Sequence, residues 1–342
     1  MKNKNKTEMV LNMGILNNRI KKAMILAGGE GTRLRPLTYI LPKPLVYVVN
    51  RPSIEYIIKF LYDFGIREFA INISYKSELM EEYVETRFKK EFKDCSLYIL
   101  KEKSLSGTAG PVKKLQNFFQ NDNFIVIGCD DIFDFDLNYL IETHIKNENV
   151  ATIALYKIND PSQFGVAIID DNNNIINFQE KPKENPISYL ANTGVYIFSS
   201  KIFDYILSEE FYDFGTQVFF NLINDKAKFQ GIDITDKPFH LKYSYWIDIG
   251  NIKSYFEANK KLIELKHPYI NSRIIKAINS ILVLGENVEI NSNTIIEGFA
   301  IIGDNSKISG YISNSIIWPN NTIYNSYIKD SIITNTNSLK NH

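Results

Sequence analysis

The stretch Lys22-Ala-Met-Ile-Leu-Ala-Gly-Gly-Glu-Gly-Thr-Arg33 is a short apolar run that ends in a cluster of glycines. Such a run is typical of a buried strand that leaves its sheet through a loop. Glycines 28, 29 and 31 allow backbone N–H groups to approach a phosphate chain closely, and Arg33 with Lys43 can neutralise its charge. The stretch therefore predicts the first strand of an α/β sheet, followed by an anion-binding loop.

The spacing of this loop differs from that of the two common phosphate-binding loops. It has no third glycine at the position of the dinucleotide fingerprint, and no Gly-Lys-Ser/Thr ending. Glycines alone fit a tight turn equally well. Phosphate binding is favoured because the same stretch also carries Arg33, Arg35 and a lysine held between two prolines, Pro42-Lys43-Pro44.

Strand patterns and helix patterns alternate along the following hundred residues. Strands are predicted at 68–73, 97–100, 124–129 and 151–156, and helices near 54–61, 78–88, 112–119 and 137–145. This alternation predicts βαβ units, and hence an α/β fold with a doubly wound, mainly parallel, Rossmann-like sheet. Ligands gather at the carboxyl ends of the strands of such sheets, where Gly28 and Asp130 are expected.

The pattern changes from about residue 280. Leu284, Ile290, Ile296, Ile302 and Ile308 recur six residues apart, with Gly, Asn and Ser between them. A six-residue period is the signature of hexapeptide repeats, and it predicts a short C-terminal parallel β-helix of left- or right-handed winding. We expect the left-handed parallel β-helix. The spacing slips after Ile308, which predicts an irregular end.

These patterns divide the chain into four parts. We predict a flexible N-terminal tail over 1–20, a catalytic domain over 21–265, a linker over 266–279 and the β-helix over 280–335.

Composition restricts the class of partner. Lys plus Arg and Asp plus Glu both total 39, so the chain has no global basic field for nucleic acid or membrane, and a small-molecule partner is favoured. Its two cysteines are too few for a disulfide framework, and its four histidines form no close-spaced set of metal ligands. We expect a cytoplasmic protein without a membrane span.

The loop after residue 26 resembles the signature of sugar-phosphate nucleotidyltransferases, and the resemblance covers most of residues 22–265. It is strongest for the branch of mannose-1-phosphate guanylyltransferases, which commonly carry a hexapeptide β-helix. Further matches follow in order: Ser106-Gly-Thr-Ala-Gly-Pro111, Phe124-Ile-Val-Ile-Gly-Cys-Asp130, Gln163-Phe-Gly-Val166, Glu180-Lys-Pro182, Asn192-Thr-Gly-Val-Tyr196 and Trp246-Ile-Asp-Ile-Gly250.

The resemblance implies a Mg²⁺-dependent reaction of a nucleoside triphosphate, best GTP, with a sugar 1-phosphate, best mannose 1-phosphate, to give a nucleotide sugar and pyrophosphate. A phosphate oxygen of the sugar attacks the α-phosphorus and is already an anion near neutral pH, so no general base is required. Catalysis then depends on positioning two polyanions and on stabilising transition-state charge, which are the catalytic roles expected of Arg33 and Lys43.

The resemblance also implies three groups of site residues. The expected metal ligands are Asp130 and Asp248, and Asp131 and Asp134 follow the metal position in the family pattern. The expected nucleotide-binding residues are Leu26, Ala27, Gly28, Gly29, Gly31, Thr32, Arg33, Glu102, Gly107 and Thr108. The expected residues for the sugar and its phosphate are Gly165, Glu180, Lys181, Asn192 and Gly194.

Glu102 is the expected reader of the nucleobase. A carboxylate can accept hydrogen bonds from both N1–H and the exocyclic amine of guanine, whereas uracil and thymine offer one ring N–H on that edge. The alternative is a solvated surface charge, because Lys101 and Lys103 flank Glu102. Leu105-Ser106 stands where the family usually has proline-leucine.

Two other functions remain open at this point. One is the same chemistry with another base or sugar, as in glucose-1-phosphate thymidylyl-, uridylyl-, cytidylyl- or adenylyltransferases. The other is an inactive regulatory subunit, which the joint presence of Arg33, Lys43, Asp130 and Asp248 opposes. A coil with acyltransferase activity would need a histidine in or beside it, so we predict instead that the coil forms a homo-oligomer.

Overall fold

The computed structural model describes residues 20–207, 211–235 and 244–334. The predicted N-terminal tail lies outside these residues, apart from Ile20, which is buried. The chain forms two compact units, one made of residues up to Glu30 with Ile57–Ile247, and one made of Gly31–Tyr56 with the residues from Asp248 onward. In the described ranges, no helix is long and apolar enough to cross a membrane.

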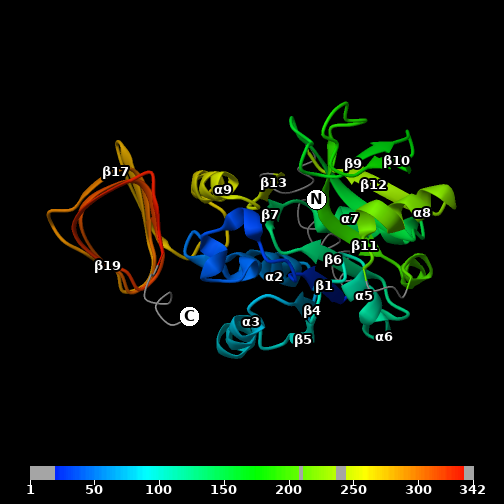
Figure 1. The fold of residues 1–342 in the computed structure, drawn as a ribbon, viewed down its shortest axis with the longest axis horizontal. Helices are drawn as coiled ribbons and strands as arrows, with labels where there is room; N and C mark the ends of the chain where they lie inside the picture. The colour runs from blue at the N-terminus through cyan, green and yellow to red at the C-terminus, as the bar shows by residue number, and fades with distance from the viewer. Residues whose placement is uncertain (1–19, 208–210, 236–243, 335–342) are drawn as a thin grey trace, which may run out of the picture. The chain divides into compact units, whose positions relative to one another are not determined.

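The first unit is built on a nine-stranded sheet (Figure 1). Strands β1, β4, β5 and β6 pair in parallel, and β11 joins β6 to β8 through antiparallel pairing. This arrangement confirms the predicted mainly parallel α/β sheet. Its strands are β1 (Lys22–Leu26), β4 (Glu68–Ile73), β5 (Ser96–Lys101), β6 (Phe124–Gly128), β8 (Ala151–Lys157), β9 (Val166–Ile169), β10 (Ile175–Gln179), β11 (Leu190–Phe198) and β12 (Phe229–Asp233).

The helices follow the apolar patterns of the sequence with two interruptions. The predicted helix over 78–88 runs from α3 through a π-helical turn at Val84–Phe88, and the one over 112–119 breaks at Leu115. Phe119, Phe124 and Phe198 belong to the core under these elements. The helices are α2 (Ser53–Asp63), α3 (Ser77–Tyr83), α4 (Lys89–Glu91), α5 (Gly110–Lys114), α6 (Gln116–Phe119), α7 (Leu137–Lys146), α8 (Phe219–Asn224) and α9 (Ile252–Leu265).

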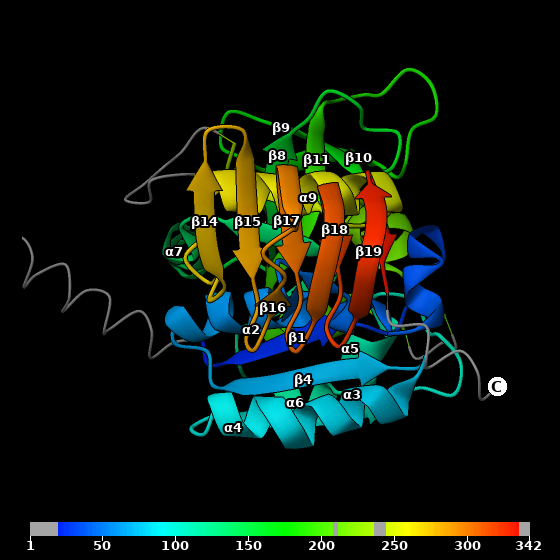
Figure 2. The same ribbon diagram turned by 90° about the vertical axis from the view of Figure 1, so that its left-hand side faces the viewer.

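The C-terminal sheet of the second unit is mainly parallel (Figure 2). Leu284 pairs with Ile302, and Ile290 with Ile308, so partners are 302 − 284 = 18 and 308 − 290 = 18 residues apart, which equals three six-residue repeats. Its strands are β14 (Arg273–Ala277), which lies in the predicted linker, β15 (Ser280–Leu284), β16 (Glu289–Ile290), β17 (Ile295–Ile302), β18 (Lys307–Ile317), β19 (Thr322–Lys329) and β20 (Ile332–Ile333).

The repeat positions share one interior, in which Ile302 and Ile308 are buried and Leu284, Ile290 and Ile296 pack against them. Farther along, the offset shortens: Ile302 pairs with Ile317, which is 317 − 302 = 15 residues later. This shortening is the structural counterpart of the slip in the sequence. A left-handed β-helix remains a prediction.

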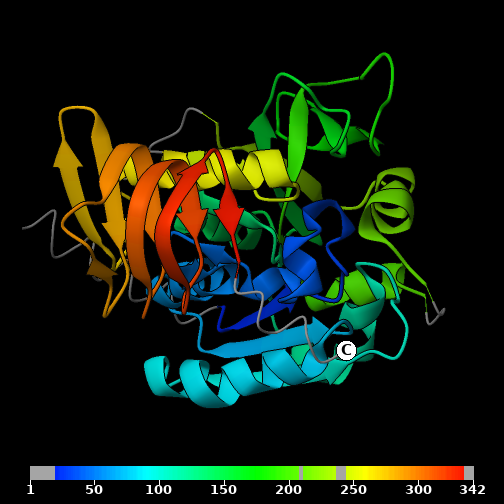
Figure 3. The same cartoon turned by 60° about the vertical axis from the view of Figure 1, so that its left-hand side comes forward.

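This sheet packs against α9 and the segment after Lys43 (Figure 3). The Trp318 indole Nε1–H donates to the Tyr255 hydroxyl at 3.1 Å, and the Tyr47 and Trp318 rings lie 5.5 Å apart. The Asn50 amide donates to the Ile302 carbonyl at 3.0 Å. Deleting the C-terminal sheet would therefore remove contacts of Tyr47 and Asn50, which lie a few residues after Lys43, an expected catalytic residue.

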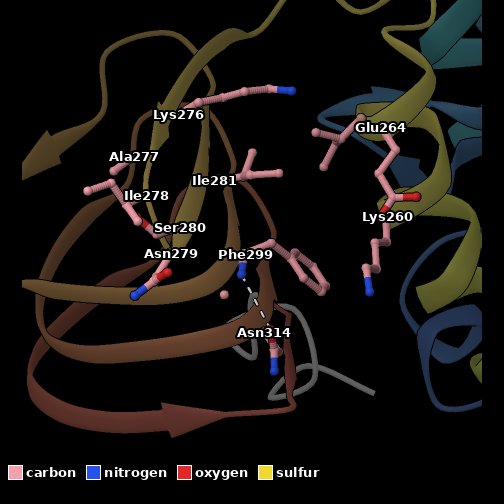
Figure 4. Close-up of a pocket in the computed structure, with 12 residues that line it drawn as sticks. Lys260, Glu264, Lys276, Ala277, Ile278, Asn279, Ser280, Ile281, Phe299 and Asn314 are labelled. Carbon is pink, nitrogen blue, oxygen red and sulfur yellow. Dashed lines mark hydrogen bonds between the residues drawn. The ribbon is translucent and has the colours of Figure 1, made fainter.

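A hollow of about 380 Å³ lies between α9 and the C-terminal sheet (Figure 4). Lys260 and Glu264 reach it from α9, and Asn279, Phe299 and Asn314 reach it from the sheet. None of the predicted substrate residues lines it, so this hollow is separate from the expected reaction site.

Candidate active site

The glycine loop begins at the edge of the sheet where β1 and β6 both end. Leu26 lies opposite Gly128 in the parallel pairing, so the loops after both strands leave the same edge. The Ala27 N–H donates to the Asn72 side-chain carbonyl at 2.9 Å. A Cβ on Gly28 would lie 2.7 Å from the Asn72 amide nitrogen and 3.0 Å from Leu105. A side chain at position 28 would therefore displace the Asn72 amide or Leu105.

The Glu102 carboxylate is buried, with 6% of the residue exposed, so it is not a solvated surface charge. Its Oε2 accepts from the Asn72 amide at 2.7 Å, and its Oε1 accepts from the Ser106 hydroxyl and from Lys114 Nζ at 2.8 Å. These donors occupy three of the roughly four acceptor positions of a carboxylate. The remaining position is on Oε2, the oxygen that lies 3.4 Å from a Cβ built on Gly28.

The segment Ser106–Gly110 is fastened to a second segment that begins at Tyr212. Tyr212 N–H donates to the Ser106 carbonyl at 3.0 Å, and the Tyr212 carbonyl accepts from Ala109 N–H at 2.9 Å. Gly107 has φ +80° and packs against the Tyr212 backbone, where a Cβ would collide. Thr108 donates its hydroxyl proton to Asp213 at 2.8 Å. The expected base segment is thus held from one side by residues far away in sequence.

Glu180 lies against two glycines. A Cβ would approach its Oε2 to 2.8 Å from Gly165 and to 2.5 Å from Gly215. Lys181 forms an ion pair with Glu180 at 3.1 Å, while its own side chain is 63% exposed. Gly165 and Gly215 together leave room for a carboxylate that can accept hydrogen bonds from a sugar.

The side chain of Asn192 forms hydrogen bonds within its own strand, β11. Its amide nitrogen donates to the Tyr196 hydroxyl at 2.9 Å, and its side-chain carbonyl oxygen accepts from Gly194 N–H at 3.0 Å. Gly194 has φ +75°, and the pairing of β11 with β8 shifts between Asn192 and Tyr196. Burial, above all, raises the pKa of Tyr196, and the carboxylates of Asp213, Glu180 and Asp131 raise it further. Asn192 therefore positions a buried hydroxyl among three acidic groups.

Asp130 and Asp131 follow β6. Asp130 Oδ1 lies 2.9 Å from a Cβ built on Gly128, and Asp131, the first residue of β7 (Asp131–Asp134), is 8% exposed. Burial raises the pKa of Asp134 to about 6. No group of three or more His, Cys, Asp or Glu side chains suited to a metal occurs in the described part of the chain. Mg²⁺ takes only one or two carboxylates from a protein, so the expected ligands Asp130 and Asp248 do not require such a group.

The expected catalytic lysine belongs to the second unit. Gly31 has φ +63°, and its carbonyl accepts from the Thr38 hydroxyl at 2.9 Å. A Cβ on Gly31 would lie 3.2 Å from Lys43 Cβ, so the stem of Lys43 packs on this loop. Ser53 donates its hydroxyl proton to the Lys43 carbonyl at 3.2 Å. The backbone of Lys43 is thus held independently of its ammonium group.

Arg33 and Asp248 converge on Gly250 in the same unit. A Cβ on Gly250 would lie 2.6 Å from Asp248 Oδ1 and 3.2 Å from Arg33 Nη2. Ser254 donates its hydroxyl proton to Asp248 Oδ2 at 3.3 Å. Arg33, an expected catalytic residue, and Asp248, an expected metal ligand, therefore both lie next to Gly250.

Sequence reasoning missed several residues of these clusters, among them Asn72, Lys114, Asp213 and Gly215. Asn72 carried a weak signal as a polar side chain within an apolar strand, and Gly215 carried one as a glycine two residues after Asp213. Lys114 adjoins another lysine, Lys113, and Asp213 falls in no quoted motif.

The nucleotidyl transferase family model matches residues 22–264. A UTP–glucose-1-phosphate uridylyltransferase from Synechocystis is 33% identical over 311 residues, which cover 84% of this chain and 77% of that protein. The chain belongs to this family. It is a sugar-1-phosphate nucleotidyltransferase, as the sequence predicted.

Its relatives differ in nucleotide and sugar. The catalytic subunit beta of mannose-1-phosphate guanylyltransferase from Drosophila melanogaster is 33% identical over 242 residues, covering 68% of this chain and 60% of that protein. A crystal structure of a putative glucose-1-phosphate thymidylyltransferase from Bacillus anthracis, in complex with sucrose, matches with a TM-score of 0.60 and 28% identity, covering 71% of this chain and 94% of that one. The three relatives thus share the nucleotidyltransferase class and differ in the base that their names give.

Proposed function

We propose that this nucleotidyltransferase joins GTP to mannose 1-phosphate and releases pyrophosphate. The observation that carries the proposal is the buried carboxylate of Glu102, whose Oε2 lies next to Gly28 and can accept an N–H of the base. The choice of guanine follows the motifs shared with guanylyltransferases. N1–H of guanine is a suitable donor to this oxygen. The motifs shared with mannose-1-phosphate guanylyltransferases support the choice of sugar.

Asp130 and Asp248 would hold Mg²⁺, which supplies positive charge to the phosphates when it is bound. Arg33 and Lys43 bind and orient the two phosphorylated substrates, so that the sugar phosphate attacks the α-phosphorus in line with the departing pyrophosphate. Their charges lower the repulsion between the two anions and stabilise charge in the transition state.

UTP with glucose 1-phosphate is the second candidate pair. The Synechocystis relative carries this specificity in its name. A single free acceptor position on Glu102 also suits uracil, which offers one ring N–H on its pairing edge. The two candidates differ in both base and sugar.

A substrate panel separates the two pairs. GTP, UTP, dTTP, CTP and ATP are each combined with mannose 1-phosphate and with glucose 1-phosphate, and pyrophosphate release is measured. We expect the highest kcat/KM for GTP with mannose 1-phosphate. A higher value for any other pair overturns this proposal and leaves the coarser nucleotidyltransferase activity intact.

Glu102→Gln is expected to lower the ratio of GTP to dTTP efficiency, because its amide donor would face the exocyclic amine of guanine, which is also a donor, whereas thymine has an acceptor oxygen at that place. An unsatisfied buried group costs about 1–3 kcal/mol, which corresponds to a several-fold or larger change in the ratio. Ser106→Ala is the matched control, since it removes one donor to Glu102 and keeps the carboxylate. An unchanged ratio in Glu102→Gln, measured by competition between the two triphosphates, would show that Glu102 does not read the base.

The chain is also proposed to form a homo-oligomer through its C-terminal sheet, within the cytoplasm. Ile295, Tyr311 and Tyr327 lie opposite one another on adjacent strands. Ile295 is 61% exposed and Tyr327 is 71% exposed, so this apolar row is available to a second copy of the chain.

Tyr327→Lys is expected to make the protein sediment as a smaller species, because it places a charge in the proposed contact. Thr322→Lys is the control, since Thr322 is an exposed residue of the same strand β19. Sedimentation velocity at several concentrations measures the effect. Identical sedimentation of wild type and Tyr327→Lys rules out this row as the contact.

A further inference from the structure

Asp213 divides its two carboxylate oxygens between two segments. Its Oδ1 accepts from Gly215 N–H at 2.9 Å and from Thr216 N–H at 3.3 Å, which caps the π-helical turn Phe214–Val218. Its Oδ2 accepts from the Thr108 hydroxyl at 2.8 Å. Capping requires only Oδ1, so the bond to Thr108 is an additional link.

The link to Thr108 is reciprocal. The Thr108 hydroxyl oxygen accepts from Phe214 N–H at 2.9 Å while its proton goes to Asp213. Thr108 and the turn after Asp213 therefore hold each other through two hydrogen bonds, and one of them involves a charged acceptor. Such charge-assisted bonds are stronger than neutral ones.

The same turn touches the expected sugar-phosphate residues on its other side. Gly215 lies so close to Glu180 that an added Cβ would be 2.5 Å from Oε2. Thr108 and Glu180 therefore contact the same turn, Thr108 through Asp213 and Phe214, and Glu180 through Gly215.

We propose that Asp213 is a positioning residue that couples nucleotide binding at Gly107-Thr108 to sugar 1-phosphate binding at Glu180. This inference rests on the proposed function, because it takes those two segments as the two substrate sites. A substrate that holds Thr108 in place also holds Asp213 and its turn next to Glu180, so the second substrate loses less conformational entropy at this turn and each substrate tightens binding of the other.

The test measures binding without turnover. Isothermal titration gives the dissociation constant of mannose 1-phosphate or glucose 1-phosphate, with and without the unreactive α,β-methylene analogue of GTP or UTP, for the pair with the highest turnover. We expect the analogue to tighten wild-type sugar-phosphate binding about tenfold, within the usual range of coupling between sites.

Thr108→Val and Asp213→Asn are each expected to reduce this factor to nearly one, and the double variant should lose no more than either single variant. Thr108→Ser keeps the hydroxyl and should restore the coupling. Thr216→Val is the matched control, because Thr216 reaches Asp213 through its backbone N–H.

Three results overturn the inference: a wild-type factor of one, an unchanged factor in Thr108→Val, or independent effects of the two substitutions. Failure of the proposed function looks different, because then the substrate panel gives the highest kcat/KM to another pair, or to none. A general loss of structure is recognised by a lowered melting temperature that Thr108→Ser shares with Thr108→Val.

Discussion

Asp130→Asn is expected to lower kcat by about a hundredfold or more at saturating Mg²⁺, because an amide loses the negative charge that holds the cation. Asp130 lies two residues after the end of the buried strand β6, so the strand itself is unchanged in the variant. Asparagine also has nearly the same shape as aspartate. The fold should therefore persist, and circular dichroism with a melting curve checks this.

Asp131→Asn and Asp134→Asn are the matched controls for this loss. Asp131 begins β7 and Asp134 ends it, so both are aspartates within four residues of Asp130. We expect both to retain much more activity than Asp130→Asn. Near-normal rates in Asp130→Asn, together with indifference to a chelator, would remove Asp130 and Mg²⁺ from the reaction.

Lys43→Ala is expected to reduce kcat by about a hundredfold to a thousandfold, since removing one well-placed stabilising group costs roughly 2–4 kcal/mol in the transition state. Lys43 is 8% exposed, and its stem packs on Gly31. Lys43→Met separates packing from charge, because methionine keeps most of the stem. Steady-state rates of both variants should fall alike.

Lys261→Ala provides the control for Lys43, since Lys261 is an exposed lysine on α9 in the same unit. Its rate should equal that of the wild type. If Lys43→Met keeps full activity, the ammonium group is not part of catalysis and the role of Lys43 is structural.

The sequence predicted the parallel half of the main sheet well. The predicted strand at 68–73 is β4, and the one at 124–129 differs from β6 by one residue. Apolar runs between glycines and helices identify buried strands because every residue of the run is covered. Strands β9 to β12 of the main sheet were not predicted. In β10, one buried residue is followed by four more accessible ones, so the strand has no continuous buried run.

The sequence proposes site residues only where they lie in contiguous motifs. Gly28, Asp130 and Glu180 are proposed in this way, whereas the residues that they contact come from other segments. Thr108 and Asp213 are 105 residues apart in the chain. The burial of Glu102 could not be predicted from the sequence either, because charged residues flank it and the preceding strand β5 is largely accessible to solvent. Tertiary contacts, which a single sequence does not display, decide these features.

The most direct test of the central claim follows the phosphorus-containing products by nuclear magnetic resonance. The full chain is incubated with Mg²⁺ and the best triphosphate, with and without the sugar 1-phosphate. We predict that pyrophosphate and a nucleotide sugar appear in equal amounts, and only when both substrates are present. Pyrophosphate formed without the sugar 1-phosphate, or no nucleotide sugar from any pair of the panel, would contradict the assignment as a sugar-1-phosphate nucleotidyltransferase.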